Sequence, residues 1–280
     1  MTIWQFVALV AAGVGAGFVG YSVGLASLIS FPATLAVGVP PVMASATNTA
    51  GNVGIVIGGC LGARPELRRR RHVALVYAVI GLVGGVIGAL LLLTLPARFF
   101  EYSVPPMLAL SALLILARPR KTAAGYDGAP ARAGGSADAG GSASRRGSAG
   151  RPERDGRRGD PGETIPMVAA MSALSVYSGY FGAGSGTATL AVLSVGKVGP
   201  YAEINALKTL GCGMANISAT IMFVITGVVH WPAMAALFIG SVVGSRFAPA
   251  VVRRVPERLM RILACVSGIV LAVYLGIRYY

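Results

Sequence analysis

Long apolar runs dominate this chain and limit what it can fold into. Eight runs with little charge follow one another, and most reach or approach the roughly 20 residues that an α-helix needs to cross a bilayer core. They occupy residues 3–37, 41–61, 73–95, 102–117, 164–196, 203–229, 232–252 and 259–277. Only 12% of the 280 residues are charged, against about 25% in a soluble domain. The sequence therefore predicts an all-α polytopic membrane protein with about eight transmembrane helices.

The first run lacks the basic segment that precedes the apolar core of a secretory signal peptide, so we interpret it as a retained span. Cys60, Cys212 and Cys265 form no C-x-x-C pair and lie in apolar runs, as small buried hydrophobic side chains do. We therefore expect no metal site and no cofactor. We also expect no enzyme, because the four acids outside the central polar segment all flank spans: Glu66, Glu101, Glu203 and Glu257.

The net charge of +14 is concentrated in short segments beside the apolar runs. Basic clusters lie at 64–71 and 253–261, and a third accompanies the polar segment 118–163. Basic residues next to spans hold those loops on the cytoplasmic side. We interpret the charge as a membrane anchor and expect no nucleic-acid partner.

Residues 118–163 divide the chain. This segment is rich in Gly, Ala, Ser and Arg, and Tyr126 is its only aromatic residue. Such a composition cannot bury enough apolar surface to offset the entropy of ordering. We predict a disordered, basic, cytoplasmic linker at 118–163 between a first transmembrane repeat at 1–117 and a second at 164–280.

The two apolar halves repeat one another. "GFVGYSVG" at 17–24 aligns with "GYFGAGSG" at 179–186 at an offset of 162, which pairs Gly20 with Gly182 and Gly24 with Gly186. A duplicated hydrophobic unit is typical of transporters built from structural repeats.

The basic clusters favour one orientation of the two halves. If 3–37 and 164–196 each crossed the membrane once, the cluster at 253–261 would lie outside, against the positive-inside rule. If each run instead folds back at its glycines as two short arms, each half has an odd number of crossings. All basic clusters are then cytoplasmic. We therefore predict inverted repeats, each beginning with a Gly-broken, re-entrant segment.

The glycines of the two re-entrant segments indicate a site. Each glycine inside a helix costs about 1 kcal/mol relative to alanine, so a purely spanning helix should not accumulate them. A broken helix exposes the N–H groups of a helix start, which attract anions. We place such starts at "GYSVG" (20–24) and "GAGSG" (182–186). The alternative is close helix packing through small residues, which we expect for the glycine pairs at 81/85 and 240/244.

The next span of each half carries polar residues at membrane depth, where they are expensive and often mark a pathway. Lys208 would bind an anion if buried, or would snorkel to the interface, being about two turns into its helix. For the asparagines a site role and interhelical hydrogen bonding are both open. The candidate substrate-binding residues are Gly20, Ser22, Gly24, Asn48, Asn52, Gly182, Gly184, Ser185, Gly186, Thr187, Lys208, Thr209 and Asn216.

The paired segments "GYFGAGSGTATLAVLSVG…INALKTL" and "GFVGYSVGLASLISFPATLAVGVP…ASAT" resemble the two signature repeats of the sulfite exporter TauE/SafE family of bacterial membrane permeases. The resemblance covers both halves. It implies transport of small sulfur-containing anions, such as sulfite or organosulfonates. It also implies that Gly182, Gly184 and Gly186, with Gly20 and Gly24, are site glycines.

We therefore predict a secondary transporter that exports such an anion across the bacterial inner membrane. Two other classes stay open, namely a membrane scaffold whose basic linker recruits partners or anionic lipid, and an anion channel. The expected partners are the sulfur-containing anion and the lipid bilayer. Glycine-rich helix faces would serve a homodimer as readily as internal packing.

Overall fold

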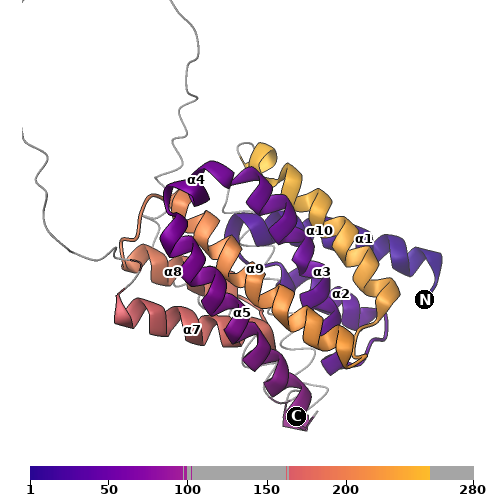
Figure 1. Cartoon of the computed structure of the whole chain (residues 1–280). Helices are drawn as coiled ribbons and strands as arrows, with labels where there is room; N and C mark the ends of the chain where they lie inside the picture. The colour runs from indigo at the N-terminus through magenta and orange to yellow at the C-terminus, as the bar shows by residue number, and fades with distance from the viewer. Residues whose placement is uncertain (97, 100–101, 103–161, 163, 253–280) are drawn as a thin grey trace, which may run out of the picture.

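The computed structural model describes residues 1–96, 98–99, 102, 162 and 164–252, and this part of the chain is helical without a β-strand (Figure 1). The helices are α1 (Ile3–Val23), α2 (Ser27–Ala36), α3 (Pro41–Gly62), α4 (Arg64–Arg69), α5 (Arg71–Thr94), α7 (Ile165–Tyr180), α8 (Ser185–Val195), α9 (Tyr201–Ile225) and α10 (Trp231–Val252). The predicted run 259–277, and all but one residue of the run 102–117 and of the linker 118–163, lie outside the described residues.

Four of these helices are long and apolar enough to cross a membrane: α1, α5, α9 and the part of α10 at Trp231–Ala248. α2 and α8 are shorter apolar helices. All-helical architecture with several apolar spans agrees with the predicted polytopic membrane protein.

The two faces of α5 are those of a helix in lipid. Its outward face carries large apolar side chains spaced four residues apart: Leu75, Val79, Val83, Ile87 and Leu91. The middle of its inward face carries glycines, and Gly81 lies against Gly211 while Gly85 lies against Ala215 of α9. Water would oppose this arrangement, whereas a bilayer accommodates it, because helices in lipid associate through close backbone approach.

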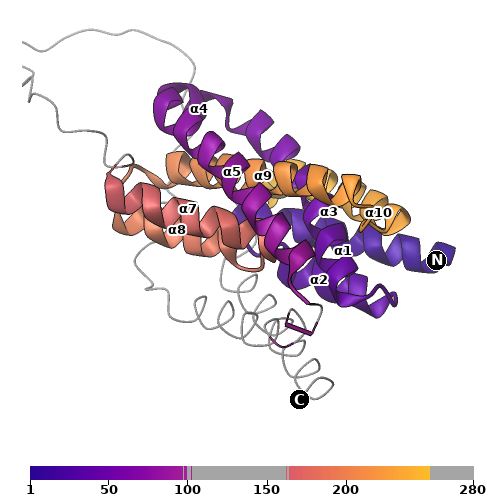
Figure 2. The same ribbon diagram turned by 60° about the horizontal axis from the view of Figure 1, so that its bottom comes forward.

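The helices occur in the same order in the two halves, and the halves interleave. α1 packs against α10, and α7 packs against α5, so the first helix of each half contacts the last long helix that the structure describes in the other. α3 and α9 contact each other. α2 packs on α1 and α3 of its own half, whereas α8 packs on α7 and α9 and also contacts α1 of the first half. Figures 1 and 2 show α5 and α9 side by side, with α7 and α8 to one side of them and α1 and α10 to the other.

Glycine contacts define the directions of neighbouring helices. Val56 of α3 lies against Gly213 of α9, and Gly59 lies against Thr209. Residue numbers rise along one helix as they fall along the other, so α3 and α9 run antiparallel.

The remaining long helices run parallel to their partners. Gly13 and Gly17 of α1 face Leu237 and Ser241 of α10 in turn. The contacts between α10 and α3, between α7 and α5, and between α5 and α9 also pair residues whose numbers rise together. The long helices of the bundle therefore form two sets of opposite direction, with α1, α3 and α10 in one and α5, α7 and α9 in the other.

Each half begins with a helix that folds back, but the arms are unequal. α1 is 21 residues long, and α2 is 10. The predicted break at residues 20–24 falls at the last of these residues: α1 continues through Val23, and Gly24, at φ 88°, ends it. Side chains of the second half bind the last carbonyls of α1 and so extend it. In the second half the prediction is confirmed, because α8 begins at Ser185 after Gly182 and Gly184, both at φ 75°.

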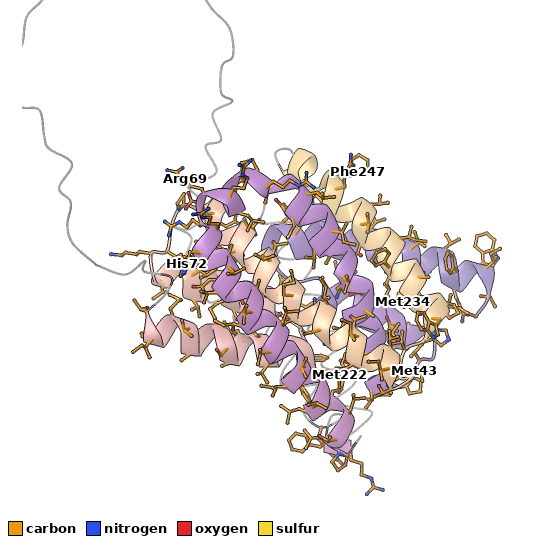
Figure 3. All side chains as sticks on the ribbon, viewed as in Figure 1. Met43, Arg69, His72, Met222, Met234 and Phe247 are labelled. Carbon is orange, nitrogen blue, oxygen red and sulfur yellow. The ribbon has the colours of Figure 1, made fainter. Side chains whose placement is uncertain are left out.

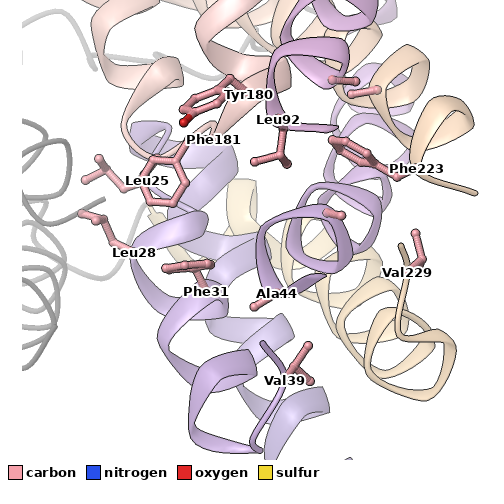
Figure 4. Close-up of a cluster of buried hydrophobic side chains, with 14 of the residues drawn as sticks. Leu25, Leu28, Phe31, Val39, Ala44, Leu92, Tyr180, Phe181, Phe223 and Val229 are labelled. Carbon is pink, nitrogen blue, oxygen red and sulfur yellow. The ribbon is translucent and has the colours of Figure 1, made fainter. Parts of the chain in front are cut away.

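A cluster of buried apolar side chains joins both breaks to the ends of the long helices (Figure 4). Phe31 of α2 and Phe181, beside Gly182, meet edge to face with ring centroids 5.2 Å apart. Leu92 of α5 and Phe223 of α9 belong to the same cluster. The edge-to-face geometry of Phe31 and Phe181 is favourable for aromatic pairs. Their contact joins the two halves on one side of the breaks.

Candidate functional site

The two breaks cross each other with their backbones in contact. A Cβ at Gly24 would overlap the carbonyl carbon of Gly186 and would lie 2.6 Å from the nitrogen of Thr187. The Thr187 hydroxyl donates a hydrogen bond of 2.8 Å to the carbonyl of Val23. Glycine is required on both sides of this crossing, since any side chain would push the halves apart.

Side chains of the second half bind the end of α1. Lys208 donates to the carbonyls of Tyr21 at 3.0 Å and Gly20 at 3.3 Å. The hydroxyl of Tyr201 donates to the carbonyl of Ser22 at 2.9 Å. A cation at the carbonyl end of a helix also complements the helix dipole. Lys208 is 3% exposed, so the snorkelling alternative is wrong.

A cavity of about 60 Å³ lies beside the crossing. Both halves contribute its lining, which consists of Gly20, Gly24, Ala26, Ser27, Thr49, Asn52, Ile55, Val56, Gly182, Ser185, Gly186, Lys208, Thr209, Cys212, Gly213 and Asn216. A water molecule needs about 10–15 Å³ on this scale, so the cavity has room for a compact group of about four to six atoms.

Most of the predicted residues come together at this cavity. Those that line it are Gly20, Gly24, Asn52, Gly182, Ser185, Gly186, Lys208, Thr209 and Asn216. The four that do not line it are Ser22, Asn48, Gly184 and Thr187. Ser22 bonds to the carbonyl of Phe18 within α1, and Gly184 is the N-cap of α8. Thr187 donates a hydrogen bond to the carbonyl of Val23 across the crossing.

The candidate residues predicted from the sequence do not include Ser27 and Thr49, which line the cavity. Ser27 and Ser185 are the first residues of α2 and α8, and both line the cavity. Thr49 and Thr209 are each the ninth residue of α3 and α9. The signal for the serines is a shared G-x-x-S, "GLAS" at 24–27 and "GAGS" at 182–185, which the offset of 162 hides.

An amide and hydroxyl network forms the first-half wall of the cavity. Asn48 donates to Ser27 Oγ at 3.0 Å and accepts from Ser30 Oγ. Asn52 donates to Asn48 Oδ1 at 3.2 Å. Asn52 Oδ1 is buried and has no hydrogen-bond partner in the described part of the chain. An unsatisfied buried acceptor is unfavourable by about 1–3 kcal/mol, so this oxygen calls for a donor.

The second-half wall is built from hydroxyls and one thiol. Ser185 lies 3.3 Å from Ser178 Oγ, and Ser178 lies 3.4 Å from Asn216 Oδ1. Thr189 Oγ1 lies 3.5 Å from Cys212 Sγ. The N–H of Gly186, near the start of α8, has no backbone acceptor among the described residues. The hydroxyls of Ser185 and Thr189 already donate to the carbonyls of Gly182 and Ser185, so the N–H of Gly186 is the donor that this wall offers to a group in the cavity.

Lys208 is the one charged residue among the described residues of the lining. Within the described ranges no group of three or more His, Cys, Asp or Glu side chains could hold a metal ion. The cavity thus combines one ammonium with neutral donors, which suits a small anion.

A second polar contact joins the halves at the start of α9. Arg70 Nε lies 2.8 Å from Glu203 Oε2, and the Glu203 side chain is 8% exposed. Exposed Arg69 lies 3.6 Å from the same carboxylate. Figure 3 shows Arg69 and Phe247 toward one end of the bundle and Met43 and Met222 toward the other. The Arg70–Glu203 pair therefore lies at the same end of the bundle as Arg69, which we call the basic end.

Helix breaks that meet at a polar cavity between two halves are a feature of secondary transporters, which bind substrate between discontinuous helices. A model of the sulfite exporter TauE/SafE family matches residues 9–275, and the chain belongs to that family. Its members are transporters and not enzymes. No curated protein and no solved structure gives a significant match to the chain.

Proposed function

We propose that this protein is a secondary transporter that exports a small sulfur-containing oxyanion, with sulfite as the first candidate, across the bacterial cytoplasmic membrane. The observation that carries the proposal is the cavity at the crossing, which holds the buried ammonium of Lys208 and is lined by both halves. Discontinuous helices at a repeat interface are where secondary transporters bind their substrates. The negative interior of a cell favours the exit of an anion.

The directions of the helices support inverted repeats. α3 and α9 hold the same place in the two halves and run antiparallel. α1 and α7 lie in the sets of opposite direction, and so do α5 and α10. A two-fold axis along the membrane normal would leave equivalent helices parallel, whereas an axis in the membrane plane reverses them.

The cavity lies between two contacts that join the halves. Along α9, Glu203 precedes Lys208 by about 7.5 Å of helix rise, and Phe223 follows the cavity residues. Glu203 binds Arg70, and Phe223 belongs to the apolar cluster that contains Phe31. Rocking of one half against the other would open one contact while the other stays closed, which is alternating access.

The test is anion flux in proteoliposomes that contain the purified protein, comparing sulfite, a sulfonate, thiosulfate and sulfate. The chain offers a matched pair of variants, Lys208→Met in the cavity and Lys197→Met at an exposed position. We expect Lys208→Met to lower sulfite flux at least about 30-fold, since truncating one partner of a buried charge contact costs about 2 kcal/mol or more. Lys197→Met should keep the wild-type rate.

Three results would argue against a carrier. Equal flux in the two lysine variants, both shown to be folded, would remove Lys208 from the site. Flux that fails to saturate and shows no countertransport would indicate a channel. Wild-type protein that transports none of the four anions, but loses a cellular function when residues 122–160 are deleted, would indicate a scaffold.

A further inference from the structure

We propose that the cavity selects a compact, singly charged anion that carries a hydrogen-bond donor, and that the transported form of sulfite is therefore hydrogensulfite and not the sulfite dianion. This inference rests on the proposed function and refines its substrate. It follows from an unpaired acceptor, the charge of the site and the size of the cavity.

The unpaired acceptor is Asn52 Oδ1. The Asn52 side chain is 4% exposed and lines the cavity. Its amide nitrogen is already committed, because it donates to Asn48 Oδ1 at 3.2 Å and approaches Ser27 Oγ at 3.5 Å. A fully deprotonated oxyanion brings only acceptors to Asn52 Oδ1, whereas a hydroxyl group on the anion satisfies it.

The charge of the site matches one negative charge. Each break sets the end of one helix beside the start of the next, α1 beside α2 and α7 beside α8. The dipole charges of about −0.5 and +0.5 at these ends largely offset each other. Lys208 then supplies a net charge of about +1, and a dianion would leave an uncompensated buried charge, which is strongly unfavourable.

The size of the cavity favours a compact ion. Its volume of about 60 Å³ corresponds to about four to six water-sized groups, which suits sulfite or methanesulfonate. Methanesulfonate is therefore the useful comparison. It has a single negative charge and nearly the same size, but it has no hydroxyl proton to donate.

Other titratable groups near Asn52 must be separated from the titration of sulfite itself. On α9 these are Lys208 and Cys212, which line the cavity. α1 carries Tyr21 and the described part of α10 carries Arg246, both outside the lining, and α2 carries none. Methanesulfonate keeps one charge state near neutral pH, so its flux reports changes in these groups alone.

The experiment measures initial rates of sulfite and methanesulfonate flux with the full chain in proteoliposomes. The pH is equal on both sides and is varied across neutrality, where hydrogensulfite loses its proton. For wild-type protein we expect the ratio of sulfite to methanesulfonate flux, at fixed total sulfite, to fall with the hydrogensulfite fraction and to approach a tenfold loss per pH unit. A ratio that is constant with pH, or that rises with the dianion, overturns the inference.

Two variants test the acceptor directly. Asn52→Leu should lower the flux ratio about ten- to hundredfold at acidic pH, the value of one unmade hydrogen bond to a buried group. Asn216→Leu, on the opposite wall, should lower both fluxes without changing their ratio, because Asn216 Oδ1 already has Ser178 as a partner. An unchanged ratio in Asn52→Leu overturns the inference. Absence of flux for every anion in the wild type overturns the proposed transport function as well.

Discussion

The two halves reach the same cavity with different chemistry. The eighth residue of α3 is Asn48 and the eighth residue of α9 is Lys208. Asn48 binds Ser27 and Ser30 of α2, within its own half, whereas Lys208 binds the end of α1 in the other half. The first half therefore supplies a fixed amide wall, and the second half supplies the charge and the tie between the halves. A repeated fold does not require a repeated function at each position.

We expect the largest effect from a change at the crossing of the breaks, to which both halves contribute. Gly24 and Gly38 have nearly equal backbone angles, φ 88° and φ 90°, but a Cβ at Gly38 meets nothing within 4 Å. Alanine in this conformation costs about 1–2 kcal/mol, and overlap with packed neighbours adds about 1–3 kcal/mol or more.

We therefore expect Gly24→Ala to abolish flux and to lower the unfolding temperature in detergent far more than Gly38→Ala does. Gly38→Ala serves as the control for backbone strain. Equal losses in the two variants would mean that strain dominates and that the contact with Gly186 has little weight.

An exchange of the two unlike residues tests whether the halves are interchangeable. We expect the double variant with Asn48→Lys and Lys208→Asn to transport no better than Lys208→Asn alone. The reason is that position 48 is fully buried, faces the serines of α2 and lies outside the cavity lining. Sulfite flux in proteoliposomes measures this, and Lys208→Arg is the control that keeps the charge in place. Recovery of flux in the double variant would show that either half can supply the cation.

Removal of the amide wall should have a smaller effect, expressed mainly in stability. Asn48→Ala leaves the hydroxyl of Ser27 without its 3.0 Å donor, so we expect a loss of about 1–3 kcal/mol. Asn205 of α9 is buried as well, but its Oδ1 has no partner among the described residues. Asn205→Ala should therefore cost less. Thermal unfolding of the two purified variants compares them, and the reverse order would contradict this account of the wall.

The smallest effect should come from the ion pair at the basic end. The third residue is Met43 in α3 and Glu203 in α9, so the first half has no counterpart of the Arg70–Glu203 contact. Glu203→Gln keeps the shape and removes the charge, and we expect a stability loss of about 1 kcal/mol, since Arg70 is partly exposed to solvent. Unfolding at low and high salt measures it. A loss that does not shrink with salt would mean that the contact is shielded from solvent.

The sequence predicts much of the fold because lipid imposes simple rules. Runs of about 20 apolar residues become spanning helices, and α5, α9 and α10 lie where the runs at 73–95, 203–229 and 232–252 predict them. The exact break in the first half is not predictable in this way. α1 continues past Gly20 because Lys208, Tyr201 and Thr187 bind its last carbonyls, and these side chains are distant in sequence.

The candidate site is predictable from the sequence where the chemistry is local. Glycine breaks and intramembrane polar residues led to Gly186, Ser185 and Lys208, all of which line the cavity. Asn48 was predicted on the same grounds but is turned away by its bonds to the serines of α2, a tertiary contact that spacing does not reveal. Ser27 was missed because the constant offset of 162 pairs Gly24 with Gly186. The shared G-x-x-S instead pairs Gly24 with Gly182 and Ser27 with Ser185.

The binding of α1 by the second half has a consequence for biogenesis. The carbonyls from Tyr21 to Val23 receive hydrogen bonds from Lys208, Tyr201 and Thr187. A ribosome makes those donors only after it has translated the 118–163 segment. Until then the nascent first half holds backbone oxygens at membrane depth without the donors of the finished protein, a state that is unfavourable by several kcal/mol per group. We therefore expect the first half to become stable in the membrane only when the second half is present.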